Sequence, residues 1–201
     1  FRPLRKERRS DSSANTPMVG RQHELTRLLS GLQSLDRGES RVMVIEADAG
    51  MGKTRLLAEL EAACQGEVTW LHSAADAIDG RTPFSTWRPL VHTLLEVTAS
   101  ATKAEREAAL LERLAHEPEV LALAPVMSTV IAVGLEDNDS TRALSGEARV
   151  RAVRRVVLAL LQRAADASPL VLSLANAQWL DSASWSLLID AVAHVSPPYV
   201  V

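Results

Sequence analysis

The sequence predicts an α/β fold in which helices cover both faces of a parallel sheet. Three observations predict it: short apolar runs alternate with helical patterns, a glycine-bearing loop follows the first apolar run, and no internal repeat is present. Strands that are separated by helices run parallel, because each connection crosses back over the sheet. A chain of 201 residues is ample for one such core and short for two.

Composition limits the classes of function. Hydrophobic residues make up 47% of the chain and charged residues 23%, which is typical of a folded protein and not of a disordered one. The formal net charge is −3, whereas proteins that bind nucleic acid usually carry an excess of positive charge, so we expect no direct contact with nucleic acid. The single cysteine, Cys64, excludes an internal disulfide and fits the reducing cytoplasm. No apolar run approaches the roughly 20 residues of a membrane span, and the histidines show no metal-ligand spacing.

Both ends of the chain suggest a piece of a longer protein. The sequence starts at Phe1 instead of Met, and it stops at Val201 within an apolar run. Residues 1–16 are basic and polar, and we interpret them as a linker from an upstream domain. An acidic or nucleic-acid partner is the alternative for this linker, although no aromatic residues interleave for stacking. We expect residues 17–201 to form one incomplete domain.

The first half of this domain alternates helix and strand. Residues 41–46 and 67–71 are predicted as strands one and two, and a helix is expected to run from the loop after strand one to about Cys64. An earlier helix ends at the Asp-Arg-Gly of 36–38, and its apolar face carries Leu25, Leu28, Leu29, Leu32 and Leu35.

Helices are expected to fill the stretch from 83 to 167. Pro83 begins one, residues 102–115 form another, Pro118 and Pro125 precede two short apolar pieces, and a long helix covers 146–167. Strand three follows at 170–174, then a helix at 182–195 and the start of a fourth strand at 199–201. We interpret the basic side chains of the long helix as a solvated face, with an acidic partner as the alternative; they are Arg149, Arg151, Arg154 and Arg155.

The loop after strand one carries the clearest chemistry. Strand, glycine loop, Lys-Thr and helix is the pattern of a phosphate-binding loop. Gly50 and Gly52 allow backbone N–H groups to point at phosphate oxygens, and the start of the next helix adds partial positive charge. Lys53 is expected to reach the β- and γ-phosphates, and Thr54 to offer its hydroxyl to Mg²⁺. The expected ligand is therefore ATP or ADP with Mg²⁺, and its loop contacts are Asp48, Ala49, Gly50, Met51, Gly52, Lys53, Thr54 and Arg55.

Two positions depart from the usual pattern. Ala47 stands where the first glycine of the loop is usual, and we expect a modest distortion because Ala is the smallest substitute. A phosphate loop also needs an acidic residue at the end of a neighbouring strand. After strand three the chain has Ala175 and Asn176, which supply no carboxylate. Asp181 is the nearest acid; we interpret it as the N-cap of the following helix, with a catalytic role as the alternative.

Three stretches together resemble the signalling P-loop ATPases of the STAND group within the AAA+-like fold. They are Met18-Val19-Gly20-Arg21-Gln22-His23-Glu24-Leu25, the loop continued through Thr54-Arg55-Leu56-Leu57, and Ala177-Gln178-Trp179-Leu180-Asp181-Ser182-Ala183-Ser184-Trp185. The middle segment, residues 137–149, and the leader Phe1-Arg2-Pro3-Leu4 resemble the ATPase module that follows the catalytic domains of soluble-type class III adenylyl cyclases.

This resemblance implies a P-loop NTPase three-layer sandwich of AAA+-like order with a helical insertion at about 83–167. It also implies that Val19, Gly20 and Arg21 lie by the adenine and ribose, and that the family's acidic pair falls on Ala175 and Asn176. Strand four is implied to lie between strands one and three. Because that strand barely begins here, we expect an open sheet edge where a central strand belongs.

The leading hypothesis is an ATP-binding regulatory module with weak or no hydrolysis, attached to an output domain such as a nucleotide cyclase. The alternatives are an active ATPase that uses Asp181 or a residue outside the chain, and a non-enzymatic scaffold or a module of a transcription regulator. Self-association is a further expected partner interaction.

Overall fold

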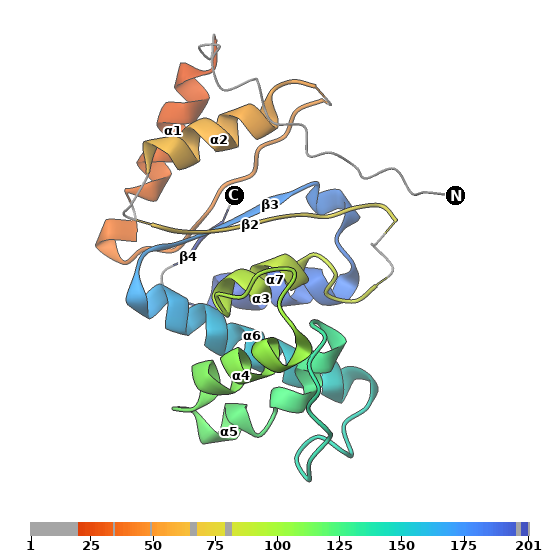
Figure 1. The fold of residues 1–201 in the computed structure, drawn as a ribbon. Helices are drawn as coiled ribbons and strands as arrows, with labels where there is room; N and C mark the ends of the chain where they lie inside the picture. The colour runs from red at the N-terminus through yellow and green to blue at the C-terminus, as the bar shows by residue number, and fades with distance from the viewer. Residues whose placement is uncertain are drawn as a thin grey trace.

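The computed structural model describes residues 20–33, 35–48, 50–64, 68–78, 82–195 and 198–200. The expected linker at 1–16, Val19 and Ala49 lie outside the described residues. Within the described part, four strands form one parallel sheet in the order β1-β4-β3-β2. The expected α/β class with a parallel sheet is therefore confirmed (Figure 1).

The central strand β3 shows why helices cover both faces. It runs from Leu170 to Ala175 and pairs along its whole length with β2, Thr69–Ala74. Successive strand residues point to opposite faces. Val171 joins a core with α1, Gln22–Leu32, and α2, Lys53–Ala63, whereas Leu170, Leu172 and Leu174 join the larger core on the other face.

The larger core is built by the helices between β2 and β3 together with α7, Ser182–His194. Figure 1 shows α3, α6 and α7 beneath the sheet, with α4 and α5 farther from it. The bounds are Trp87–Leu94 for α3, Lys103–Leu114 for α4, Pro118–Leu121 for α5, Ala124–Thr129 for the 3₁₀ helix η4 and Gly146–Ala167 for α6. At its N-terminus α4 has a capping box, in which Thr102 and Glu105 each accept a hydrogen bond from the other's main-chain N–H.

Several boundaries differ from the sequence prediction. The first helix stops at Leu32, and the 3₁₀ helix η2, Leu35–Arg37, follows it. β2 begins at Thr69 and continues to Ala74, because β3 offers a hydrogen-bonding partner at every position. α3 begins at Trp87 instead of Pro83, since Phe84 adopts a φ of 61°, which a right-handed helix excludes.

Strand β4, Pro198–Val200, lies between β1 and β3, as the resemblance implied. We expected an open edge at this central position, but β4 occupies it and pairs with β1 at Arg41–Tyr199 and Val42–Val200. The last bond of this ladder runs from the N–H of Met43 to the carbonyl of Val200 at 2.7 Å. β1 covers only Arg41–Val42, and beyond the bond of Met43 residues 44–46 continue without a strand partner among the described residues; Val44 is 85% exposed.

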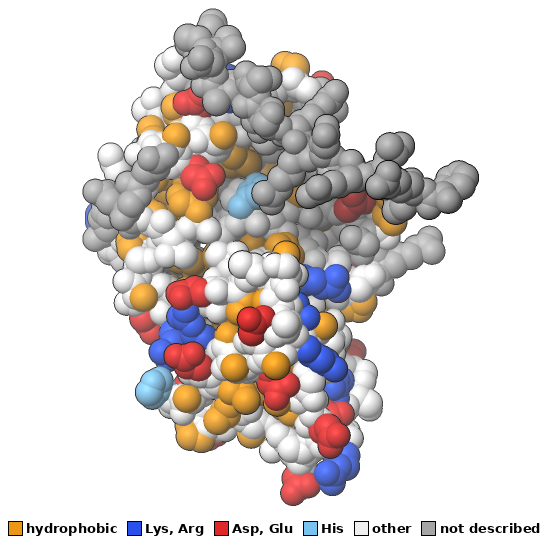
Figure 2. Space-filling view, viewed as in Figure 1, with side chains coloured by type: hydrophobic (Ala, Val, Ile, Leu, Met, Phe, Trp, Pro, Cys, Tyr) orange, Lys and Arg blue, Asp and Glu red, His pale blue; other side chains and the backbone are white. Residues whose placement is uncertain are grey.

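The four arginines in the first half of α6 form ion pairs, so the solvated-face interpretation is incomplete. Arg149 pairs with Asp137, Arg151 with Glu147, Arg154 with Asp190 on α7, and Arg155 with Glu119 on α5. Figure 2 shows basic and acidic side chains interspersed over this helical part of the molecule. None of the helices in the described part of the chain is both long and apolar enough to span a membrane.

Candidate functional site

The glycine loop connects β1 to α2 and depends on two left-handed residues. Gly50 has a φ of 81° and Gly52 a φ of 78°. A Cβ added at either glycine meets no atom within 4 Å, so it is the backbone conformation, and not space, that requires glycine. The N–H of Met51 donates to the carbonyl of Asp48 at 3.3 Å, which tightens the loop into a turn.

Helix α2 starts directly after this turn and presents an uncapped N-terminus. Its N-cap is Gly52, which offers no side chain to cap the helix, and the first turn carries no acidic residue. The first N–H groups of a helix have no partner within the helix, and they bear the positive end of its dipole. This combination makes the loop and the start of α2 suited to an anion.

Lys53 is the first residue of α2, and its ammonium lies against the beginning of the loop. It donates to the main-chain carbonyls of Ala47 and Asp48, the latter at 3.0 Å. The position expected to distort the loop, Ala47, is therefore a partner of the lysine. Thr54 follows in the first turn and is exposed. Arg55 forms an ion pair with Glu59 at 2.7 Å, one turn farther along the helix.

The segment before α1 reaches the same loop. Gly20 has a φ of 82°, and Arg21 is the N-cap residue of α1. Arg21 donates from Nη2 to the carbonyl of Met51 at 3.1 Å and from Nη1 to Oε1 of Glu24 at 2.9 Å. The structure thus brings Arg21 to the loop that follows β1.

Glu24 is a residue that the sequence reasoning did not single out. A hydrogen bond from its own main-chain N–H, and then the Arg21 guanidinium, hold the pKa of Glu24 below its usual value. The carboxylate is therefore charged at neutral pH and orients Arg21. The sequence does contain a signal for this pair, namely the spacing: a Glu three residues after an Arg at the start of a helix can form an ion pair with it.

The end of β3 lies beside the end of β2, at the carboxyl edge of the sheet that also carries the glycine loop. Asn176 has a φ of 57° and donates from Nδ2 to the carbonyl of Ala75 at 3.3 Å. The N–H of Ala75 in turn donates to the carbonyl of Ala175 at 3.0 Å. Asn176 is thus tied to the neighbouring chain segment, and no carboxylate occupies either position. Among the described residues no group of three His, Cys, Asp or Glu side chains could hold a metal ion.

Asp181 is the N-cap of α7, as the capping interpretation expected. Its Oδ1 accepts from the N–H of Ser184 at 2.9 Å and its Oδ2 from the Ser184 hydroxyl at 2.5 Å. Ser184 is fully buried, and its carbonyl accepts from Nε1 of Trp87 at 3.3 Å. Both carboxylate oxygens therefore have structural partners.

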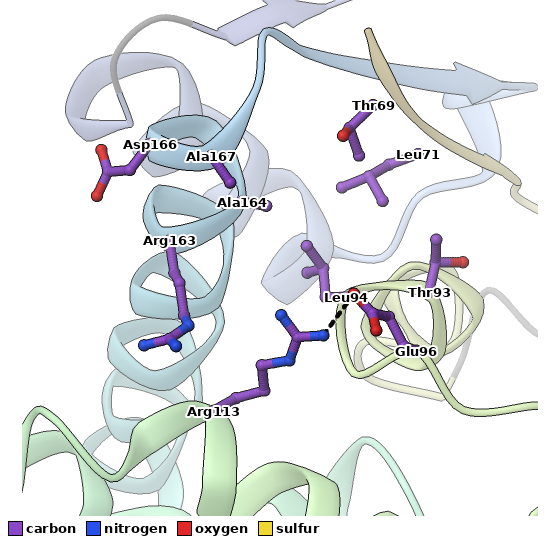
Figure 3. Close-up of a pocket in the computed structure, with 10 residues that line it drawn as sticks. All are labelled: Thr69, Leu71, Thr93, Leu94, Glu96, Arg113, Arg163, Ala164, Asp166 and Ala167. Carbon is purple, nitrogen blue, oxygen red and sulfur yellow. Dashed lines mark ion pairs between the residues drawn. The ribbon is translucent and has the colours of Figure 1, made fainter. Parts of the chain in front are cut away.

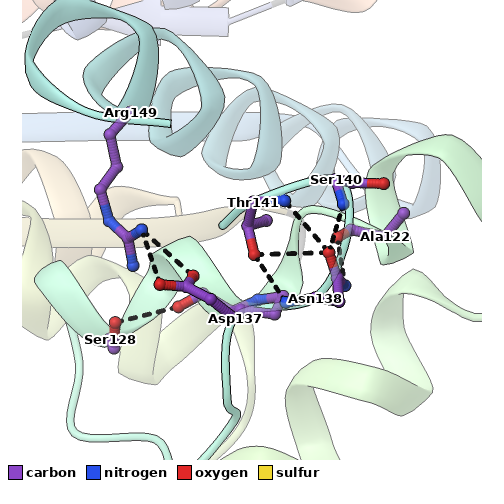
Figure 4. Close-up of polar contacts among 8 residues, drawn as sticks. Ala122, Ser128, Asp137, Asn138, Ser140, Thr141 and Arg149 are labelled. Atoms are coloured by element: carbon purple, nitrogen blue, oxygen red, sulfur yellow. Dashed lines mark hydrogen bonds and ion pairs between the residues drawn. The ribbon is translucent and has the colours of Figure 1, made fainter. Parts of the chain in front are cut away.

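Residues 137–149, the segment that resembles the cyclase-associated ATPase module, contain polar side chains whose contacts hold the local structure together (Figure 4). Arg149 of α6 donates to both carboxylate oxygens of Asp137, at 3.1 and 3.2 Å. Asn138 accepts at Oδ1 from the N–H of Thr141 and donates from Nδ2 to the carbonyl of Ala122. Thr141 is fully buried. These side chains anchor the turn between η4 and α6.

Comparison with known proteins agrees with the loop geometry. A curated relative, an uncharacterized protein of Rhizobium meliloti (strain 1021), is 29% identical over 186 residues, which cover 90% of this chain. The chain spans only 17% of the length of that relative. No solved structure matches the chain. The family model described as the AAA ATPase domain matches residues 17–201, and the chain therefore belongs to the AAA ATPase domain family.

Proposed function

We propose that this chain is an ATP-binding regulatory module of a multidomain signalling protein, with weak or no hydrolysis of its own. The observation that supports the proposal is the pairing of the glycine loop, with Lys53 against its start, and neutral residues at the end of β3. Lys53 is at the loop, whereas Ala175 and Asn176 stand where the acidic pair of the resembled family falls.

The residues around the loop fit a nucleotide with Mg²⁺. The uncapped first turn of α2 and the left-handed Gly50 and Gly52 offer backbone N–H groups to phosphate oxygens. Lys53 would leave the carbonyls of Ala47 and Asp48 for the β- and γ-phosphates, and Thr54 would hold Mg²⁺. Bound Mg²⁺ neutralises phosphate charge. The remaining expected contacts along the loop are Asp48, Ala49, Met51 and Arg55.

The base and ribose side of the nucleotide is assigned to Val19, Gly20 and Arg21. Arg21 supports this assignment because it is held at the loop by the Met51 carbonyl and by Glu24. Weak hydrolysis of ATP is expected because Ala175 and Asn176, at the end of β3, provide no carboxylate. An amide can hydrogen-bond a metal-bound water but cannot act as a base, and removing one charge-placing group commonly costs on the order of 10²–10³ in rate.

Titration of the protein with a fluorescent ATP analogue tests binding. Lys53→Ala is expected to lose most of the affinity, because it removes the one side-chain cation assigned to the phosphates. Lys103→Ala is the matched control: Lys103 is also the first residue of a helix, α4, and lies in the helical part away from the loop. Equal binding by wild type, Lys53→Ala and Lys103→Ala would refute the proposal and favour a scaffold with a vestigial loop.

The finer architecture belongs to the same proposal. We infer a three-layer sandwich of AAA+-like order, with 83–167 as a helical insertion and the STAND group as the subfamily. A class III nucleotide cyclase is the proposed output domain, in the cytoplasm, with self-association between modules. That the relative is far longer than this chain supports a multidomain context. Determining the reading frame on both sides of the chain tests it, and an output domain of another class would reject the cyclase.

The second candidate function is an active ATPase, favoured by membership of the AAA ATPase domain family. Asp181 or a residue outside the chain would then supply the missing carboxylate. ATP turnover that is abolished by Asp181→Ala, in a variant that still binds nucleotide, would establish this alternative.

A further inference from the structure

A cavity of about 440 Å³ lies at the end of the sheet opposite the glycine loop (Figure 3). Thr69, the first residue of β2, lines it. The glycine loop instead follows the last residue of β1, and all neighbouring strands are parallel. The two sites are therefore on opposite edges of the sheet, and none of the residues assigned to the nucleotide lines this cavity.

Three helices end around the cavity. The last turns of α3, α4 and α6 contribute Leu94, Arg113 and Ala164, and β2 contributes Leu71. Figure 3 shows the Arg113 guanidinium directed into the space between α3 and α6. Apolar and charged side chains both line this open pocket, and its volume is within the roughly 300–1,000 Å³ that small-molecule sites occupy.

The guanidinium groups of the cavity have hydrogen-bonding capacity to spare. Arg113 forms an ion pair with Glu96 at 2.5 Å; its side chain is 30% exposed and that of Glu96 is 77% exposed. Arg163 makes no hydrogen bond or ion pair with any described residue. The other acid of the wall, Asp166, accepts from Nε2 of Gln162 at 2.7 Å. Each guanidinium has five N–H donors, so both arginines can still bind an oxyanion.

Glu96 is placed at the rim by the way α3 ends. Its N–H donates to the carbonyl of Thr93, and the N–H of Val97 donates to the carbonyl of His92, both at 3.0 Å. This pattern puts Glu96, with a φ of 56°, at a position where glycine is usual. The carboxylate that pairs with Arg113 therefore extends from a strained and exposed position. An external anion can displace it more readily than a buried partner.

We propose that this cavity binds a small organic anion, a carboxylate or phosphate monoester with an apolar body. Arg113 holds the anionic group, the exposed Arg163 adds positive charge at the rim, the apolar side chains of the lining contact the rest of the ligand, and Glu96 competes for Arg113 as an internal anion. The proposal is independent of nucleotide binding at the glycine loop.

Calorimetric titration with benzoate, phenyl phosphate and the neutral isostere benzamide tests the site. We expect at least one of the two anions to bind, and benzamide to bind at least about tenfold more weakly. Arg113→Gln is expected to weaken anion binding about tenfold, and Arg163→Gln by a smaller factor because its charge is at the exposed rim. Arg142→Gln is the control, because Arg142 is an exposed arginine that pairs with Asp139. Lys53→Ala is expected to leave anion binding unchanged, which separates this site from the loop.

Glu96→Gln provides a gain of binding that misfolding cannot mimic. Removal of the competing carboxylate should tighten anion binding by about threefold to tenfold, because Arg113 is then released from its ion pair. The proposal is overturned if neither anion binds, if benzamide binds as well as benzoate, or if the two arginine variants bind like wild type. Loss of phenyl phosphate binding in Lys53→Ala alone would also overturn it, since the anion would then occupy the loop.

Discussion

Arg21 donates a hydrogen bond to the main-chain carbonyl of Met51 at 3.1 Å, and this bond joins the start of the first helix to the glycine loop. The same guanidinium is held by Glu24. Two segments that the sequence analysis assigned separately to the nucleotide are therefore in direct contact. Such preorganisation lowers the entropic cost of binding.

Arg21→Ala is expected to weaken binding of an ATP analogue by about tenfold, because the segment before α1 loses its bond to the loop. Glu24→Gln should act in the same direction but less strongly. Arg27→Ala, which changes an exposed arginine of the same helix, is the control for fluorescence titration. If Arg21→Ala binds the analogue as tightly as Arg27→Ala, the contact has no role in binding.

Substitutions of Gly52 should follow backbone preference instead of size. Gly52→Ala is expected to destabilise the protein by about 1 kcal/mol, because its φ of 78° is unfavourable for alanine. Gly52→Asn should lose less, since asparagine tolerates this region, although its side chain is larger. Urea denaturation measures the order. An asparagine variant that is less stable than the alanine variant would show that steric crowding decides instead.

Asp181→Ala is expected to destabilise the protein by about 1–2 kcal/mol, because α7 loses its cap and the buried Ser184 loses its acceptor. Asp181→Asn should retain part of this stability. Nucleotide affinity should be unchanged in both variants. Urea denaturation and analogue titration of the same samples check the pair of expectations, and a loss of affinity at full stability would assign Asp181 to the site.

His92 should make stability depend on pH. Burial, followed by the charges of Arg106 and Arg88, lowers the pKa of His92 from its ordinary value of about 6.5. The folded state thus binds fewer protons than the unfolded state. Stability is fully present above about pH 6.5 and is lost as the pH falls toward the lowered pKa of the folded state.

Urea midpoints between about pH 7.5 and pH 5 test this dependence. His92→Gln should reduce the loss of stability at acid pH, whereas His116→Gln, at an exposed position, should not. An unchanged profile in His92→Gln would mean that other groups cause the loss. Nε2 of His92 has no hydrogen-bond partner among the described residues, so nothing in the described part offsets the cost of its protonation.

The sequence was most informative where a local signal decides the structure. The periodic apolar face and the loop residues at its ends predicted α6 with both of its boundaries, Gly146 and Ala167. The glycine loop and Lys53 at the start of α2 were also predicted, because turn chemistry and helix start are local properties. Asp181 could be interpreted as a cap for the same reason.

Features that depend on distant partners were less predictable. β2 continues through His72 and Ser73, beyond the predicted end of strand two at residue 71, because β3 pairs with them. Ser73 is buried, and its hydroxyl donates to the carbonyl of Thr86. Likewise, the contact of Arg21 with Met51 and the cavity around Arg113 result from tertiary packing that no local pattern encodes.

Phosphate release from ATP is the measurement that tests the account most directly, because the central claim is a site that binds nucleotide with little or no turnover. Wild type, Lys53→Ala and Lys103→Ala should be compared at ATP concentrations that saturate the wild type. We predict that the wild type binds ATP yet releases phosphate no faster than Lys53→Ala, since Ala175 and Asn176 provide no carboxylate. Phosphate release that is clear in the wild type and in Lys103→Ala, but absent in Lys53→Ala, would contradict the account.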